Sequence, residues 1–411
     1  MEAEICSLSP PDWPIFSVEE ICKRVTSGGT PSRSRPDFYM NGSWPWVKTQ
    51  ELQDSWIYHT EEQITDEAVA NSSAKVLPAN TILLAMYGAT VGQLGLLRTQ
   101  MTCNQACCAI IVNPEKANFR YLYYQLRHSR EQLKNLATGA AQQNLSGALI
   151  RSLRYPFPHL KAQEVIAEVF GNMDDKIELN RRMNEKLEAI AQALFKSWFI
   201  NTTQTKLQQG WHEGKVSDLL TVSRNGINPG EFPDEIFDHY SMPAFDESKR
   251  PKHEAGKKIK SNKFIVSTNC VMISKLNPRI PRVWLPDLRG QNRAVCSTEF
   301  IVTIPRSGVS REFLSCLFKD DSFIRVLATM VTGTSSSHQR VKPESLLDME
   351  VAIPPHGLIQ EFTDAITPLL ARINKNIAES STLSTLRDAL LPKLLSGELK
   401  YDANNATDPE R

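Results

Sequence analysis

The fold of this chain is decided by two stretches of similar pattern, KAQEVIAEVFGNMDDKIELNRRMNEKLEAIAQALFKSWF (Lys161–Phe199) and LIQEFTDAITPLLARINKNIAESSTLSTLRDALLPKLLSGEL (Leu358–Leu399). In each, the apolar residues are spaced mainly by threes and fours and charged residues fill the other positions, which predicts a long helix with a narrow apolar stripe. Such a stripe is not stable alone in water and needs a partner helix. The simplest partner is its twin, so the sequence predicts an antiparallel coiled coil.

The two stretches repeat one pattern at a constant offset, and each follows a proline-rich break. The matched pairs are Phe170/Ile366, Met173/Leu369, Ile177/Ile373, Asn180/Asn376, Leu187/Leu383, Ile190/Leu386 and Leu194/Leu390. Pro368 predicts that the second helix either begins or kinks there. The alternative interpretation is that both are surface helices packed on their own domains, although a surface helix usually shows a wider apolar face.

The segments in front of the two helices also correspond. Each contains short strands (within Val76–Arg98 and Phe264–Pro286), a short helix (Phe119–Ala137 and Arg311–Thr329), a polar loop (Thr138–Ser146 and Thr332–Arg340) and a final strand. This order predicts two similar α+β domains, each followed by a long helix. The expected boundaries are 13–158 and 211–355 for the domains, 159–203 and 356–399 for the helices, 204–214 for the linker, and 400–411 for a disordered tail.

Composition narrows the class of protein. The 411 residues carry a formal net charge of +1, contain no apolar run long enough to cross a membrane, and begin without a secretory signal, so we expect a cytoplasmic protein. Three of the eight cysteines, Cys103, Cys107 and Cys108, lie in the apolar stretch TCNQACCAIIV. Without a second ligand pair at zinc spacing they are interpreted as reduced thiols of a buried strand, and no metal site is expected.

Local charge and polar loops indicate nucleic acid binding. Between Lys249 and Arg293 there are twelve Lys or Arg residues and two acidic ones, interleaved with Asn, Gln and Ser, which is the mixture that positions phosphates and reads base edges. A solvated basic surface is the alternative. The glycine- and arginine-bearing loop TSGGTPSRSR (Thr26–Arg35) and the two matching polar loops add to this signal. The candidate DNA-binding residues are Ser27, Gly28, Gly29, Thr30, Ser32, Arg33, Arg35, Lys48, Thr49, Gln142, Gln143, Asn144, Arg224, Asn225, Lys257, Lys258, Arg279, Arg289, Gln291, Arg293, Ser336, His338, Gln339 and Arg340.

Catalytic motifs are scarce. There is no Walker phosphate loop, dinucleotide-binding fingerprint, methyltransferase signature or nucleophile elbow. One nuclease-like set occurs, Asp234 with Glu247 and Lys249, in which two carboxylates and a lysine could hold a metal ion and activate water. A stand-alone metal-dependent nuclease therefore stays open as an alternative, as does a helical scaffold without a DNA role. The missing methyltransferase signature argues against another alternative, a fragment of a restriction-methyltransferase fusion.

With these residues in view, the chain resembles the specificity (S) subunits of type I restriction-modification enzymes, over nearly its whole length after the first dozen residues. The resemblance is carried by SGGTPSR (27–33), PWVKTQEL (45–52), MYGATVGQLGLL (86–97), TGAAQQNLS (138–146), KIELNRRMNEKLEAIAQALFKSWF (176–199) and LLPKLLSGEL (390–399). The second domain departs from the pattern, because TVSRNGINPG (Thr221–Gly230) stands where the SGGTPS motif is expected.

The resemblance implies a non-catalytic subunit with two target-recognition domains, each reading one half of a split, asymmetric site on double-stranded DNA, with the paired helices as a ruler between them. It also implies two copies of a DNA adenine methyltransferase subunit docked on the helices, and motor-nuclease restriction subunits. S-adenosylmethionine, ATP and magnesium would bind to those partners, and no cofactor to this chain. The candidate partner-binding residues are Met183, Leu187, Leu194, Trp198, Leu383 and Leu390.

Overall fold

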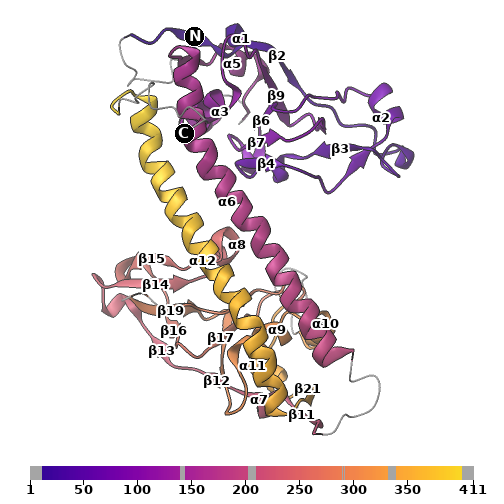
Figure 1. Ribbon diagram of the computed structural model, residues 1–411, viewed down its shortest axis with the longest axis vertical. Coiled ribbons are helices and arrows are strands. Elements are labelled where there is room, and N and C mark those ends of the chain that lie inside the picture. Colours follow the sequence, from indigo (N-terminus) through magenta and orange to yellow (C-terminus); the bar gives the residue numbers. More distant parts are fainter. Residues whose placement is uncertain are drawn as a thin grey trace, which may run out of the picture. The chain divides into compact units, whose positions relative to one another are not determined.

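The computed structural model describes residues 12–138, 144–201, 210–288, 290, 292–331 and 339–399. The chain forms two compact units, coloured along the sequence in Figure 1. Unit 1 combines the residues up to Leu179 with those from Ser380 onward, and unit 2 is Asn180–Glu379. Each long helix therefore contributes one half to each unit.

Unit 1 begins with short strands, continues through a mixed α and β region, and ends in the first half of a long helix. Its elements are β1 (Ile15–Ser17), α1 (Val18–Ile21), β2 (Cys22–Ser27), η1 (Pro36–Phe38), β3 (Trp44–Val47), η2 (Thr49–Glu51), β4 (Ser55–Ile57), β5 (Gln63–Ile64), α2 (Asp66–Ala70), β6 (Ile82–Ala85), η3 (Gly88–Thr90), β7 (Leu94–Leu97), β8 (Thr102–Cys103), β9 (Cys107–Val112), α3 (Phe119–His128), α4 (Arg130–Thr138), α5 (Gly147–Ser152), β10 (Arg154–Pro156) and α6 (Leu160–Phe195).

The main sheet of unit 1 is buried on both faces. Its strand order is β2-β9-β6-β7-β4, antiparallel except for the parallel pair β4 and β7. Alternate residues of β6 enter two different cores: Ile82 and Leu84 pack in the core that contains α3, and Leu83 and Ala85 pack in the core on the opposite face. This explains why these strands are continuous apolar runs. A smaller sheet, β5-β3-β8, lies beside it.

Unit 2 repeats the same plan. Its elements are β11 (His212–Lys215), α7 (Val216–Leu219), β12 (Leu220–Ser223), β13 (Gly226–Ile227), η6 (Pro229–Glu231), β14 (Ile236–Tyr240), α8 (Met242–Ser248), β15 (Lys252–Ala255), η7 (Gly256–Lys258), β16 (Lys263–Ile265), β17 (Val271–Ser274), β18 (Val283–Trp284), β19 (Arg293–Ser297), β20 (Phe300–Pro305), α9 (Arg311–Leu317), α10 (Asp321–Thr329), α11 (Pro343–Leu347), β21 (Glu350–Ile353) and α12 (His356–Leu395), with the π-helical turn η4 (Lys196–Ile200) ending α6.

The sheets of the two units correspond strand by strand. The order β12-β20-β17-β18 matches β2-β9-β6-β7, and the pair β11-β21 matches β1-β10. In the second sheet of unit 2, β15-β14-β19 matches β5-β3-β8, including the parallel pair, and β13 and β16 extend it to five strands. The internal repeat expected from the sequence is thus a repeat of topology.

The long helices α6 and α12 pair antiparallel, as predicted (Figure 1). In unit 1, Asp174 of α6 forms an ion pair with Arg387 of α12. In unit 2, Asn180 donates to Glu379 Oε2 (2.9 Å) and Asn376 donates to Asn184 Oδ1 (2.8 Å). As the residue numbers rise along α6 from Asp174 to Asn184, the numbers of their partners on α12 fall from Arg387 to Asn376. The two helices therefore run antiparallel. Residues from both helices also enter the domain cores.

Pro368 does not begin the second helix, because α12 starts at His356, after Pro355. The proline removes one backbone donor, and the carbonyl that loses its partner belongs to Asp364, which is exposed to water. The hydroxyls of Thr363 and Thr367 donate to carbonyls one turn earlier (2.6 and 2.7 Å). The helix can therefore run through this position.

The prediction of a single short helix in each domain is wrong. Each is two helices, α3 and α4 in unit 1 and α9 and α10 in unit 2. The first break is at Ser129, whose hydroxyl donates to Gln125 O (2.8 Å) and contacts the buried hydroxyl of Tyr155 (2.9 Å). The second break ends at Asp320, whose carboxylate accepts from Ser322 N (2.9 Å) and so caps α10.

None of the described helices is long and apolar enough to span a membrane.

Candidate nucleic-acid interface

The glycines of the loop after β2 approach the protein's own backbone. A Cβ atom on Gly28 would lie 2.2 Å from Cys103 O, and one on Gly29 would lie 2.3 Å from Ala74 N. Both glycines are buried, and Gly29 O accepts from Trp46 Nε1 (3.0 Å). The close approach that the sequence suggested is therefore an internal one, which shapes the loop and leaves the polar residues after it outside.

The polar residues of this loop are partly tied down. The Ser27 carbonyl accepts from Lys75 Nζ (3.3 Å), and the Thr30 hydroxyl donates to Gln105 Oε1. Ser32 is exposed and shares a hydrogen bond with Ser34 (2.8 Å). Thr49, at the start of η2, is half-buried.

Arg33 and Lys48 converge on one carboxylate. Nη1 and Nη2 of Arg33 donate to Glu62 (2.6 and 3.1 Å), and Lys48 Nζ donates to Glu62 (2.9 Å) and Glu61 (2.6 Å). The Arg33 hydrogen bonds, followed by those of Lys48, hold the pKa of Glu62 at about 2. The guanidinium also lies 4.2 Å from the ring centre of Tyr39. The cluster is thus a braced ionic corner that keeps little net charge.

Arg35 is more exposed. It is paired with Asp37 through Nε and Nη2 (2.9 and 2.6 Å) and with Glu67 through Nη2 (2.9 Å). Surface pairs of this kind contribute about 0–1 kcal/mol. A DNA phosphate could therefore replace Asp37 or Glu67 at little cost.

The ends of the two polar loops occupy the same place in the two units. Asn144 forms a bridge with Tyr87, just after β6, and Arg340 forms one with Leu276, just after the equivalent strand β17. Asn144 and Arg340 are both exposed. Six predicted residues, Gln142, Gln143, Arg289, Gln291, Ser336 and His338, lie outside the described residues.

In unit 2 the structure brings four predicted residues to one corner. Arg224 and Asn225 follow β12, and Asn225 O accepts from Ile265 N (2.9 Å). Gln339 O accepts from Asn277 N (3.0 Å), which places Gln339 beside the turn after β17. Arg224 and Arg340 are both exposed, so the corner presents two guanidinium groups.

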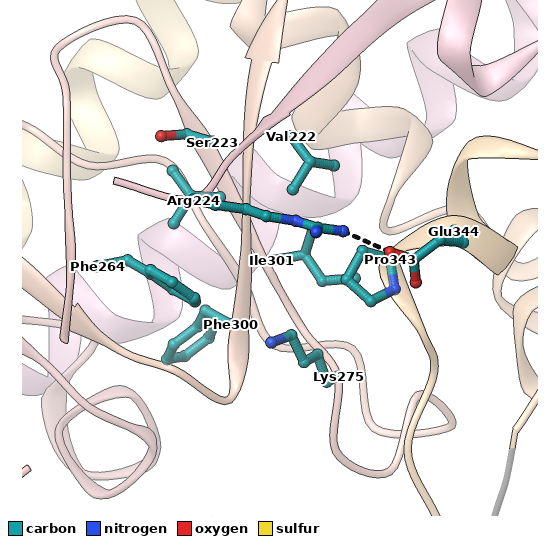
Figure 2. A pocket seen from close by; sticks show the side chains of 10 residues that line it. Val222, Ser223, Arg224, Phe264, Lys275, Phe300, Ile301, Pro343 and Glu344 are labelled. Carbon is teal, nitrogen blue, oxygen red and sulfur yellow. Dashed lines mark hydrogen bonds and ion pairs between the residues drawn. The ribbon is translucent and has the colours of Figure 1, made fainter. Parts of the chain in front are cut away.

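A shallow cavity of about 210 Å³ opens at this corner. Figure 2 shows Arg224 reaching across it to Glu344, with which it forms an ion pair, while Lys275, Phe264 and Phe300 lie lower in the view. The apolar rings and the two cations give the cavity an amphipathic lining.

Lys275 was missed by sequence reasoning. It occupies the position of Met86 in unit 1, because the carbonyl of each accepts from the matching loop residue: Val341 N for Lys275 (3.0 Å) and Leu145 N for Met86 (2.7 Å). Met86 is buried in the core, whereas Lys275 is half-buried and its Nζ donates to Thr298 O (2.6 Å). Partial burial lowers the pKa of Lys275. Only alignment of the two halves at this residue could have indicated the change.

A second group of basic residues in unit 2 comes from the start of β19 and from η7. Arg293 donates from Nε and Nη2 to Glu235 (2.9 and 2.5 Å) and lies over the ring of Phe232 (4.4 Å from its centre). Lys257 and Lys258 follow in η7, both exposed. Among the other predicted residues, Arg279 is exposed beyond the turn at Asn277.

The predicted partner-binding residues divide into two groups. Leu194 and Trp198 pack against the main core of unit 2, and Leu390 packs against that of unit 1. Met183, Leu187 and Leu383 are half-buried on the paired helices. The first group therefore holds domains to helices.

The nuclease-like residues do not form a site. Asp234 pairs with Lys257 (3.2 Å), Glu247 with Lys252 (2.7 Å), and Lys249 with Glu188 (3.1 Å). Within the described part of the chain, no group of three or more His, Cys, Asp or Glu side chains is placed to hold a metal ion. The cysteines of the TCNQACCAIIV stretch are free thiols in β8 and β9, as expected, and burial raises the pKa of Cys108 to about 12.

The family model of the type I restriction modification DNA specificity domain matches residues 10–189. Over these residues the chain is similar to the DNA specificity domains of type I restriction-modification systems. The chain is 27% identical to the type I restriction enzyme MjaIX specificity subunit of Methanocaldococcus jannaschii, in an alignment that covers 96% of this chain and 95% of the relative.

Two further matches extend the comparison. The chain is 23% identical to the HindI specificity subunit of Haemophilus influenzae, over 61% of this chain and 70% of that one. Among solved structures, the S subunit of a type I restriction-modification system from M. genitalium superposes with a TM-score of 0.55 at 16% identity, covering 95% of this chain and 98% of that chain. At this identity the match supports the fold alone.

Proposed function

We propose that this chain is the DNA-reading subunit of a type I restriction-modification assembly. It would read a bipartite, asymmetric site and direct adenine methylation and DNA restriction by partner subunits without being catalytic itself. The observation that carries this is the duplicated placement of Asn144 and Arg340, which belong to the two polar loops and lie beside equivalent strands. Residues 13–158 and 211–355 would each read one half-site, and the helices at 159–203 and 356–399 would set the spacer between them.

The contacts to DNA divide by chemistry. Exposed cations such as Arg35, Lys258 and Arg279 suit phosphates, which position a protein on the duplex without reading sequence. Asn144 and Arg340, at the loop ends, suit base edges, since Asn pairs with adenine and Arg with guanine. Such a protein binds DNA with an affinity that falls steeply with salt, which a helical scaffold without a DNA role would not do.

Matched exposed positions on the helices support two copies of one partner. Ile190 and Leu386 are equivalent in the repeat and are 48% and 44% exposed. Because a repeated surface suits a repeated partner, we place two DNA adenine methyltransferase subunits there, and motor-nuclease subunits complete the assembly. S-adenosylmethionine, ATP and magnesium belong to these partners in this proposal, and we assign no cofactor to this chain.

The test is to co-express the chain with its methyltransferase partner in a host that lacks DNA methylation and to read the genome for methyladenine. One split, asymmetric motif is expected. A stable complex that methylates no motif and binds DNA without salt dependence would contradict the proposal. Magnesium-dependent cleavage by the purified chain would favour the nuclease alternative instead.

The docking position has its own test. Ile190→Glu or Leu386→Glu alone is expected to leave one methyltransferase per complex, and the double variant none, as measured by light scattering. Leu179→Glu is the matched control, because Leu179 is 50% exposed on the same helix while Lys375 stands at its counterpart position. Two methyltransferases on the double variant would place docking elsewhere.

A further inference from the structure

The way in which an arginine is paired decides whether it can read a base. A guanidinium meets a carboxylate either end-on, through Nη1 and Nη2, or side-on, through Nε and one Nη. Reading guanine also needs a pair of donors from the guanidinium, directed at O6 and N7. An end-on carboxylate therefore occupies the fork that would read guanine, whereas a side-on carboxylate holds the plane of the group and leaves the Nη end available.

The predicted arginines differ in this respect, although Arg340 also meets its carboxylate, Glu299, side-on through Nε (2.9 Å) and Nη2 (3.2 Å). Arg33 meets Glu62 end-on, through Nη1 and Nη2, so its fork is taken. Arg35 meets Asp37 side-on, but its Nη2 also donates to Glu67. Arg293 meets Glu235 side-on, through Nε (2.9 Å) and Nη2 (2.5 Å). Within the described residues no hydrogen bond is found from Nη1 of Arg293.

Arg293 is also held in place by aromatic rings. Its guanidinium carbon lies 4.4 Å from the ring centre of Phe232 and 5.4 Å from that of Phe237. Its side chain is 37% exposed, so the group is braced but reaches solvent. Two nearby rings and a carboxylate at the edge restrict the rotamers of a long side chain, which lowers the entropy lost on binding.

The surroundings of Arg293 suit a DNA groove. Phe232 is 38% exposed, and aromatic side chains make apolar contact with the thymine methyl group. The backbone of η7 is tied to the same loop, because Gly256 N donates to Glu235 O (2.9 Å) and Lys257 N donates to Pro233 O (3.1 Å). The loop thus carries the carboxylate that braces Arg293 and anchors Lys257, with Lys258 next to it.

We infer that Arg293 reads a guanine in the major groove of the second half-site. Glu235 is its positioning residue, Phe232 supports its plane, and Lys257 and Lys258 contact flanking phosphates. This inference rests on the proposed function and deepens it, because it assigns one base pair to one side chain. It also separates Arg293 from Arg33, whose fork is occupied and whose role is to brace the loop of the first domain.

The experiment compares the motif methylated by the complex of this chain and its methyltransferase with those of three variants. Arg293→Ala is expected to lose discrimination at one G·C pair of the second half-site, with affinity for the original site about 5- to 150-fold lower, and to leave the first half-site unchanged. Arg293→Lys keeps the charge and should also lose the guanine. Glu235→Gln keeps a hydrogen-bonding side chain and is expected to keep the guanine with a smaller fall in affinity.

Arg306→Ala is the matched control, because Arg306 is an exposed arginine of the same domain, bound to Ser217 O at the end of β20. It removes the same charge and is expected to leave the motif unchanged. Circular dichroism and co-purification with the methyltransferase check that each variant is folded. The salt dependence of binding should be the same for Arg293→Lys and wild type.

The outcomes separate the two proposals. No split motif for the wild-type complex would remove the proposed function and the inference with it. A split motif without a G·C pair in the second half-site, or one left intact in Arg293→Ala, would overturn the inference alone. Loss of all discrimination in both halves for Arg293→Ala would also overturn it, because the residue would then act on the whole complex.

Discussion

Replacing Asp174 by Ala should destabilise unit 1 more than its position on a helix surface suggests. Its carboxylate accepts from Tyr124 Oη (2.8 Å) and Arg127 Nη1 (3.3 Å) and pairs with Arg387 of the other helix. The side chains of Arg127 and Arg387 are only 14% and 7% exposed. Removing the one carboxylate they share leaves two poorly solvated cations side by side.

The magnitude follows from these contacts. Breaking a buried ion pair from one side costs about 3–5 kcal/mol, because the remaining charge is left unpaired. Arg387 keeps a bond to Asp388 (2.8 Å), which offsets part of that loss. Tyr124 loses its acceptor, which costs about 1–3 kcal/mol when the hydroxyl is buried. We therefore expect Asp174→Ala to lower the free energy of unfolding by about 3–5 kcal/mol.

Asp175→Ala is the control, one residue further along the same helix. Its carboxylate is more exposed and bonds Arg120 (2.9 Å) and Trp56 Nε1 (2.9 Å), so we expect a loss of about 1 kcal/mol. Urea unfolding of the full chain gives the stability, and hydrogen exchange of amides in α3 and the first half of α6 assigns the loss to unit 1. Equal losses within about 0.5 kcal/mol for Asp174→Ala and Asp175→Ala would refute the reasoning.

Three further predictions concern single positions. Gly28→Ala places a methyl group against backbone atoms and is expected to cost about 1–3 kcal/mol in thermal unfolding, whereas Gly147→Ala in α5, with no neighbour closer than 3.7 Å, should stabilise by about 0.5–1 kcal/mol. Lys275→Met should stabilise unit 2. Between the lowered folded-state pKa of Lys275 and its usual value of 10.5, the unfolded chain binds more protons than the folded chain, so the stability of wild type rises with pH in this range and that of the variant does not. Equal changes in stability on alkaline titration of the two proteins would contradict this prediction. Because the folded-state pKa of Glu62 is about 2, ionised Glu62 contributes stability above pH 4.5 that wild type loses as the pH falls towards 2, and Glu62→Gln should remove this contribution. If urea unfolding shows the same loss of stability between pH 4.5 and 2 in the variant as in wild type, the prediction is wrong.

The helix pair and the duplication could be predicted from sequence because they rest on spacing. Apolar residues repeated over some ten turns leave few alternatives to a long helix, and copying the pattern supplies its partner. Asn180 and Asn376, aligned by the repeat alone, are both fully buried between the helices. The breaks at Ser129 and before Asp320 were missed, because each depends on a single side chain that bonds locally.

The candidate interface was harder to predict, because its geometry is set by residues far apart in the sequence. Arg293 is braced by Glu235, and Arg224 by Glu344, and no local pattern indicates either carboxylate. The sequence identified these arginines as basic residues, but it could not indicate whether a carboxylate of the same chain occupies their Nη1 and Nη2 donors. Gly28 shows the same limit, since its small size could serve either a DNA backbone or the chain's own.

The discontinuous make-up of unit 1 has a consequence for how the chain is made. Its core contains Leu391 and Leu395 from the last turns of α12, so the ribosome must translate as far as Leu395 before that core can close. Unit 2 is continuous in sequence and needs nothing that is synthesised after Glu379. A nascent chain can therefore complete its second domain first, and a premature stop between Glu379 and Leu391 would leave the core of the first domain incomplete. Proteases would then degrade the first domain because of a lesion in the codons of α12.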